Sequence, residues 1–348
     1  MNYDEIIFLL GAGASYDAGI PVSSEMMKDI ESFISDENKK DNWGKYKNLY
    51  YCLKSGIQYG HGIINKSEEM NIEKLVNTMD ELIKSYEHPV FPFVGSWVPR
   101  LMELAGEEFK NIREFRNLIV DQLENWMKPK HDEYSNYYEG FLRFQKEYEM
   151  PIKIFSLNYD LCLEKQCKLS HIECNRGFEK YLWGYGNFDK HDNDEDRINL
   201  YKLHGSIDWE YNNEGVIERD DKIDNLAIIF GTSYKLQYLD PFLYLFYEFR
   251  RQTLDKVTKI INCIGYSFND DHINGILGQA LNANTNKKII SIQPINDEKS
   301  EKERIMGKLG IKNIDNIEVV NMSAKDFLTL KISKDFYLRY LDTGDVPF

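Results

Sequence analysis

An apolar run that leads directly into two closely spaced glycines constrains this chain most. Residues 6–10 (IIFLL) are all apolar, as in a strand that is buried on both faces of a parallel sheet. Residues 11–15 (GAGAS) follow, and a glycine has no Cβ to keep a phosphate away from the backbone. A helix after such a turn would present its first free N–H groups to an anion. The pattern predicts either a cradle for a nucleotide diphosphate or a tight strand-to-helix turn.

The residues after these glycines exclude two common nucleotide-binding classes. A dinucleotide-binding dehydrogenase needs a third small residue at the sixth position, where this chain has Tyr16. A P-loop needs a lysine followed by serine or threonine, and neither follows here. Gly19 and Pro21 instead predict a sharp turn soon after the loop.

Later apolar runs indicate the fold class. The runs that resemble the first strand are residues 151–157, 198–203, 226–230, 259–264, 288–292 and 317–320. Short β-rich runs separated by helical spacing predict an α/β fold with a Rossmann-like, doubly wound parallel sheet. We expect residues 285–348 to complete this sheet with strand and helix.

A long segment without strands separates the first two runs. The apolar spacing of residues 72–86 and of residues 109–127 is helical. Pro89, Pro92, Gly95 and Pro99 are expected to divide the helices between these stretches. We therefore expect a helical insertion over residues 22–148, within a single domain that spans residues 1–348.

Composition narrows the partners and the compartment. The formal net charge of −14 gives no general reason to bind nucleic acid or an anionic membrane. The acidic start of the chain does not resemble a signal peptide, and no apolar run reaches the length of a bilayer span. We expect a cytoplasmic protein without a membrane partner.

Cysteines and acidic residues do not form a recognisable metal motif. The five cysteines are odd in number and irregularly spaced, which fits a reducing compartment, and no C-x2-C pair exists for zinc. Residues 187–197 are strongly acidic but lack the glycine and the closing glutamate of an EF-hand. We interpret them as a solvated loop, and we expect neither zinc nor another metal.

Polar residues follow the second predicted strand. Ligands of open parallel sheets bind beyond the carboxyl ends of the strands. Asn158 and Asp160 are two residues apart at such an end, and could hold a carboxamide and a water. The alternative is an Asx turn in which Asp160 caps a helix that begins near Leu161.

Two further strand ends carry residues that suit chemistry. His204 precedes a glycine at one end, and histidine is well suited to act as a general base near neutral pH. Gly265 and Ser267 follow another strand, where they could contact a ribose. The alternatives are a turn histidine without a role and a strand exit followed by an Asx cap near His272.

Four motifs in this order, GAGAS with a following AGIP, SLNYD, LHGS and GYS, resemble the sirtuin-like NAD-binding family over about residues 6–295. That family shows GAGxS with GIP, then T-Q-N-x-D, a catalytic histidine before glycine, and a late G-T/S-S segment. The resemblance implies that Asn158 and His204 are catalytic, the first positioning water and the second acting as the general base. It implies the following NAD-binding residues: Ala12, Gly13 and Ser15 at the pyrophosphate, Asp160 at the carboxamide, and Gly265, Ser267 and Gln293 at the adenosine.

Departures from the protein-deacylating sirtuins point to a particular branch of that family. The C-x2-C zinc module is missing, and residues 22–24 (VSS) stand where those enzymes have Asp-Phe-Arg. The phrases LHGSIDW and IGYSFNDD resemble the bacterial branch, in which such a domain destroys NAD during antiphage defence. The resemblance thus implies an NAD+ glycohydrolase that needs no cofactor besides its substrate and is held inactive until triggered.

Relatives in this branch imply further partners. We expect a homo-oligomer, and a separate activator or a ring-forming ATPase is a further partner that the resemblance implies. Two other functions stay open at this point: a sensor or assembly subunit that binds NAD or ADP-ribose without turnover, and an NAD-dependent protein deacylase. A pure binder has no need of a base at the ribose, so the pair of Asn158 and His204 favours an enzyme.

Overall fold

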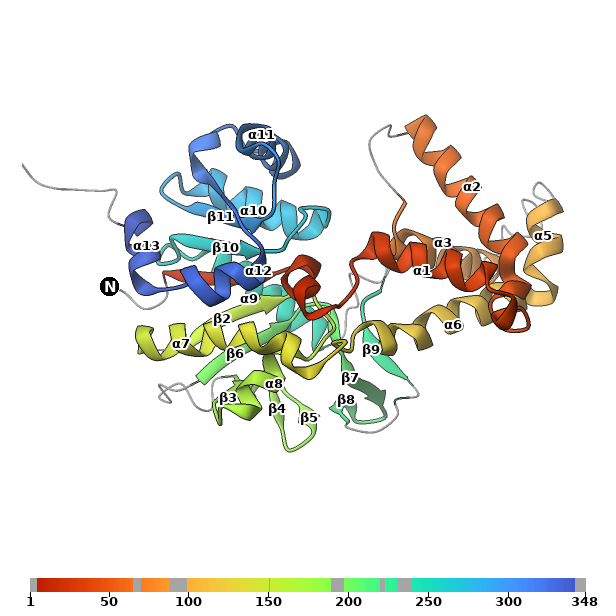
Figure 1. Cartoon of the computed structure of the whole chain (residues 1–348), viewed down its shortest axis with the longest axis horizontal. Helices are drawn as coiled ribbons and strands as arrows, with labels where there is room; N and C mark the ends of the chain where they lie inside the picture. The colour runs from red at the N-terminus through yellow and green to blue at the C-terminus, as the bar shows by residue number, and fades with distance from the viewer. Residues whose placement is uncertain are drawn as a thin grey trace, which may run out of the picture. The chain divides into compact units, whose positions relative to one another are not determined.

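A seven-stranded parallel sheet organises the larger part of the chain (Figure 1). The computed structural model describes residues 5–64, 70–87, 99–149, 151–188, 197–219, 223, 225–230 and 240–341. The strands, in spatial order, are β12 (Ile317–Asn321), β11 (Lys288–Gln293), β10 (Ile260–Ile264), β1 (Ile6–Leu10), β2 (Ile152–Ser156), β6 (Arg197–Lys202) and β3 (Glu173–Asn175). All their pairings are parallel, which confirms the predicted α/β fold with a Rossmann-like sheet.

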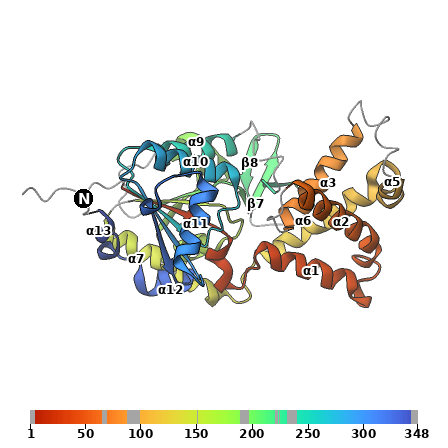
Figure 2. The ribbon, with the colours of Figure 1, turned by 90° about the horizontal axis from the view of Figure 1, so that it is seen from above.

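Helices cover both faces of this sheet, as its composition requires. Every residue of β1 and of β10 is buried, because neither face is open to water. The covering helices include α7 (Glu139–Tyr148), α9 (Phe242–Leu254), α10 (Asp271–Ala283), α12 (Ala324–Asp326) and α13 (Lys334–Leu341). Figure 2 shows α9 and α10 along one face and α7, α12 and α13 along the other. After β11 the chain continues through α11 (Glu298–Leu309) to β12, which pairs with β11 at the edge of the sheet.

A second sheet corrects one predicted strand. It is antiparallel, in the order β4 (Phe178–Glu179), β5 (Leu182–Trp183), β8 (Gly215–Glu218), β7 (Gly205–Asn212) and β9 (Leu226–Ile228). The run 226–230 was expected in the parallel sheet, but β9 pairs antiparallel with β7. β8 and β9 both run antiparallel to β7, one on each side of it, so β9 extends the sheet that the β7–β8 hairpin begins.

The chain divides into two compact units, which are described separately. The sheet unit comprises Met1–Ile20, Lys128–Ile228 and Gln237–Phe348. The helical unit comprises Pro21–Met127 and Ile229–Leu236. The predicted insertion, residues 22–148, extends beyond the helical unit, because α7 belongs to the sheet unit. That the whole chain is a single domain stays a prediction.

The helical unit contains the two helices that apolar spacing predicts. They are α3 (Ile72–Glu87) and α6 (Lys110–Trp126), and the other helices described here are α1 (Ser23–Ser35), α2 (Lys47–Ile64) and α5 (Pro99–Ala105). Ile72, Leu75, Val76 and Met79 of α3 are buried. The ring of Phe115 on α6 stacks on Tyr46 at 5.0 Å between centroids. Three of the predicted breaks, Pro89, Pro92 and Gly95, lie outside the described residues.

Among the described helices, none has both the length and the apolar composition needed to cross a membrane. The acidic segment interpreted as a solvated loop falls mostly outside the described residues.

Two glycines of α10 offer a matched test of how closely α10 packs against the end of α11. A Cβ at Gly278 would lie 2.1 Å from the carbonyl oxygen of Leu309, whereas a Cβ at the exposed Gly275 meets nothing within 4 Å. Gly278→Ala should lower the free energy of unfolding by about 1–3 kcal/mol through overpacking. Gly275→Ala should raise it by about 0.5–1 kcal/mol, because alanine is the better helix former. Urea denaturation measures both, and equal responses would contradict the described contact of α10 with Leu309.

Candidate functional site

The polar motifs lie along one edge of the parallel sheet. Across that edge the strand ends carry Gln293 (β11), Gly265 and Ser267 (β10), residues 11–15 (β1), Asn158 and Asp160 (β2) and His204 (β6). The strand order reverses between β1 and β10, because the chain adds β2 and β6 on one side and later β10, β11 and β12 on the other. In open α/β sheets such a reversal creates the crevice where ligands bind.

The glycines of the first turn pack against the backbone that follows β10. The amide of Gly11 donates to Ile264 O (3.0 Å), and the amide of Gly13 donates to Gly265 O (2.9 Å). A Cβ at Gly11 would lie 2.6 Å from Gly265 O, and one at Gly265 only 2.1 Å from the amide nitrogen of Ala14. Gly265 also has a φ of +62°, which favours glycine. The sequence pattern is thus explained by a close backbone approach at the reversal point, whether or not a phosphate also binds there.

The helix after this turn differs from the simplest expectation. Residues Ala12–Ala18 form a short 3-10 helix, η1, which ends at Gly19. The α-helix α1 begins only at Ser23, so the turn does not run directly into an α-helix. The predicted sharp turn at Gly19 is confirmed, because Gly19 has the left-handed backbone conformation.

A buried hydrogen-bond network joins the first turn to the end of β2. Ser15 Oγ donates to Asp160 Oδ2 (2.7 Å) and accepts from Asn158 Nδ2 (3.2 Å). The same amide nitrogen donates to Gly11 O (2.9 Å), and all three side chains are buried. The structure therefore brings together residues from two motifs, Ser15 from the first turn and Asn158 and Asp160 from the end of β2.

Asp160 confirms the Asx turn that its position allows, and its role toward a ligand stays a prediction. One carboxylate oxygen accepts from Ser15, and the other accepts from the amide of Cys162 (3.0 Å) at the start of α8 (Cys162–Leu169). It is therefore a member of the buried network and also a helix cap. Burial and the nearby Asp160 carboxylate raise the pKa of the Cys162 thiol, which stays neutral at ordinary pH.

Two tyrosines complete this network, and sequence reasoning missed both. Tyr138 OH lies 2.8 Å from Ser15 Oγ, and Tyr137 OH donates to Ala14 O (2.6 Å). Burial raises the pKa of both phenols well above the usual value, so both remain neutral. They belong to the 3-10 helix η6 (Asp132–Tyr138), within the range predicted as an insertion, where no motif distinguishes them from core aromatics.

A cluster of charged side chains is bonded to the backbone that follows β2. Arg176 pairs with Glu164 (3.4 Å), with Asp208 (2.9 Å) and with Glu218. Lys202 pairs with Glu164 (3.1 Å) and also donates to the main-chain oxygen of Asp160. The cluster thus connects α8 and the second sheet to the backbone of the site.

His204 lies between two aromatic rings and a carboxylate. Its ring centroid is 6.4 Å from that of Tyr159 and 6.2 Å from that of Phe246. Its Nε2 atom is 3.3 Å from Asp270 Oδ2, but the pair is not aligned as a hydrogen bond. Both side chains are buried. The motif containing Asp270 predicted a helix cap, which is confirmed, but its proximity to His204 was not predicted.

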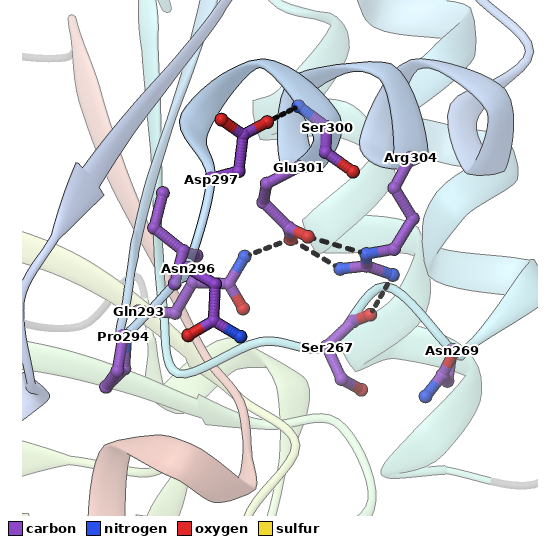
Figure 3. A pocket seen from close by; sticks show the side chains of 10 residues that line it. Ser267, Asn269, Gln293, Pro294, Asn296, Asp297, Ser300, Glu301 and Arg304 are labelled. Carbon is purple, nitrogen blue, oxygen red and sulfur yellow. Dashed lines mark hydrogen bonds and ion pairs between the residues drawn. The ribbon is translucent and has the colours of Figure 1, made fainter.

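Ser267 and Gln293 line a cavity of about 480 Å³ at the ends of β10 and β11. Gln293 Nε2 donates to Ser291 Oγ (3.2 Å) and to Glu301. Arg304 donates to both Glu301 oxygens (2.8 and 2.6 Å) and to Ser267 O (3.0 Å), as Figure 3 shows. Polar atoms from two strand ends and from α11 therefore surround this cavity.

The predicted residues thus fall into three groups along one edge. Ser15, Asn158 and Asp160 bond to one another, His204 lies beside Asp270, and Ser267 and Gln293 share the cavity. Gly265 joins the first turn to the cavity, because it contacts Gly13 and precedes Ser267. Within the described part of the chain, no three His, Cys, Asp or Glu side chains gather as a metal site would require.

Comparison with known proteins adds a family relationship for part of the chain. A family model for a SIR2-like domain matches residues 152–317. This match supports a sirtuin-like family and suggests a function related to NAD. The matched range includes Asn158, His204 and Gln293, but residues 11–15 lie outside it. No curated protein matches the chain.

Removal of one hydroxyl tests the buried network. Ser15→Ala should lower the free energy of unfolding by about 1–3 kcal/mol, because Asp160 and Asn158 then lose a buried partner. Ser55→Ala makes the same chemical change at an exposed position of α2 and should stay within about 0.5 kcal/mol of the original chain. Chemical denaturation with both variants measures the difference. A Ser15 variant as stable as the Ser55 variant would show that the network contributes nothing.

Proposed function

We propose that this protein is an NAD+ hydrolase that cleaves the bond between nicotinamide and ribose, releasing nicotinamide and ADP-ribose. One observation carries the proposal: residues suited to hold NAD and to activate water lie at the carboxyl ends of adjacent strands, beside the reversal of strand order. The SIR2-like match over residues 152–317 supports the NAD-related part.

The proposed orientation of NAD follows the order of the strands. The pyrophosphate would lie at the first turn, against Ala12, Gly13 and Ser15. The adenosine would extend over β10 and β11, with Gly265 and Ser267 at its ribose and Gln293 farther along. The cavity of about 480 Å³ beside Ser267 and Gln293 is large enough to support this placement. Asp160 would hold the nicotinamide carboxamide at the end of β2.

The chemistry needs a base and a positioned water more than it needs an acid. Nicotinamide leaves from a cationic ring, so the bond breaks without protonation of the leaving group. Asn158 would hold the water against the ribose carbon, and His204 would accept its proton. A general base of this kind typically contributes about 10²–10⁴-fold to the rate. Orientation of water and ribose by the buried amide adds to this factor.

The buried network supports the proposal that the enzyme is held inactive until triggered. Asp160 and Asn158 are bonded to Ser15 and to the Gly11 carbonyl within the protein. To contact NAD, they must exchange at least one of these bonds for a bond to the ligand. Such an exchange is a step that a trigger could control.

The proposed biological role is NAD depletion during bacterial antiphage defence, in the cytoplasm. We propose a homo-oligomer that requires no zinc and no cofactor besides NAD+ as substrate, activated by a separate protein or beside a ring-forming ATPase.

A sensor that binds NAD or ADP-ribose without turnover is the second candidate. The buried carboxylate beside His204 favours an enzyme over a sensor, because a binder has no need of an oriented base. An NAD-dependent deacylase is the third candidate, and it would require an acylated peptide for turnover.

Substitution of the two proposed catalytic residues tests the enzyme. His204→Ala should reduce nicotinamide release from NAD by about 10²–10⁴-fold, because the base is lost. Asn158→Ala should also abolish most turnover, because the water is no longer held. Nicotinamide release is measured by chromatography under conditions in which the unmodified chain is active, and thermal melting verifies that each variant is folded.

The matched control is His272→Ala, which removes an exposed histidine of α10. It should keep the original rate. Folded His204 and Asn158 variants that both retain full turnover would exclude this site. Formation of O-acetyl-ADP-ribose that depends on an acetylated peptide would favour the deacylase instead.

A further inference from the structure

Asp270 contacts His204 from a distant part of the sheet. His204 follows β6 and Asp270 follows β10, and the sheet order places β1 and β2 between these strands. Three strand spacings of about 4.8 Å separate the ends of β6 and β10. The segment after β10 therefore extends over two other strand ends before Asp270 Oδ2 comes within 3.3 Å of His204 Nε2.

The carboxylate is held firmly in this position. Asp270 Oδ1 accepts hydrogen bonds from the amides of His272 (3.0 Å) and Ile273 (3.3 Å) at the start of α10. The N-terminus of this helix also stabilises the negative charge of the carboxylate. The helix thus fixes one oxygen, and the other lies beside His204 Nε2.

The buried environment of His204 strengthens its interaction with Asp270. The side chains of His204 and Asp270 are 5% and 7% exposed, so water screens the pair only weakly. The aromatic rings of Tyr159 and Phe246 also lie beside the imidazole, and neither ring carries a charge. Because the present alignment falls short of a hydrogen bond, a small rotation of the imidazole is needed to form one.

We propose that Asp270 is a positioning residue that sets the tautomer and the orientation of His204. This inference rests on the proposed hydrolase function. Nε2 carries the proton and faces Asp270, so Nδ1 keeps the lone pair that serves as the base. In the reaction, Nδ1 takes one proton of the attacking water and the water oxygen bonds to the ribose carbon. The bond to nicotinamide breaks, and its electron pair goes to the nicotinamide nitrogen.

Asp270→Asn separates this role from the helix cap. The cap needs an acceptor, so the amide oxygen of the asparagine stays with His272 and Ile273, and an NH₂ group replaces the oxygen at His204. An NH₂ group donates to Nε2 and so favours a proton on Nδ1, which removes the base. We expect kcat for nicotinamide release to fall by about 10²–10⁴-fold, with little change in KM.

Asp271→Asn is the matched control. It removes the same charge from the next residue of α10, which is exposed. It should leave kcat unchanged and melt at a temperature close to that of Asp270→Asn. An Asp270→Asn variant that is folded and keeps the original kcat would overturn the proposal.

A spectroscopic readout keeps the proposal testable whether or not NAD is hydrolysed. ¹⁵N NMR of the full chain with labelled histidine, assigned by the signal missing in His204→Ala, should show His204 protonated at Nε2 at a pH where the ring is neutral. Asp270→Asn should move the proton to Nδ1, and Asp271→Asn should not. A His204 protonated at Nδ1 in the unmodified chain would overturn the positioning role. Absence of NAD turnover by that chain together with the expected tautomers would count against the hydrolase alone.

Discussion

The backbone contact between the first turn and the end of β10 is the constraint on which the site depends. Gly11 and Gly13 donate to Ile264 O and Gly265 O, and a side chain at either glycine would collide with Gly265. This contact fixes the two loops at the point where strand order reverses. Asn158 is bonded to the same turn through Gly11 O, so the position of the proposed water-holding amide depends on the glycines too.

The parallel sheet was predictable because most of its strands are continuous apolar runs, and the segments between these runs are long enough to form helices. The second sheet was less predictable, because β9 has the composition of a core strand and nothing in its own residues indicates that it pairs with β7. β3 was missed because its three residues contain no apolar run. That Asn158, His204 and Ser267 lie along one edge could be predicted, because the carboxyl ends of parallel strands all lie on the same side of a sheet.

Contacts between distant segments could not be predicted from the sequence. The hydroxyl of Tyr138 lies within hydrogen-bond distance of Ser15, which is 123 residues away in the chain. No motif around Tyr138 indicates this contact. Asp270 has a recognisable local function as a helix cap, which concealed its second contact with His204. A carboxylate that satisfies a local motif can thus use its other oxygen elsewhere, and only the tertiary structure reveals the partner.

The central claim is that the carboxyl edge of the parallel sheet holds the ADP-ribose part of NAD. Hydrogen–deuterium exchange with and without ADP-ribose, the product that remains after cleavage, tests this claim most directly. We expect slower exchange in residues 11–19, 157–162, 264–271 and 293–297, and no change in the cavity beside Tyr181 and Asn212 on the second sheet. Unchanged exchange at the strand ends, or protection confined to the second sheet, would contradict it.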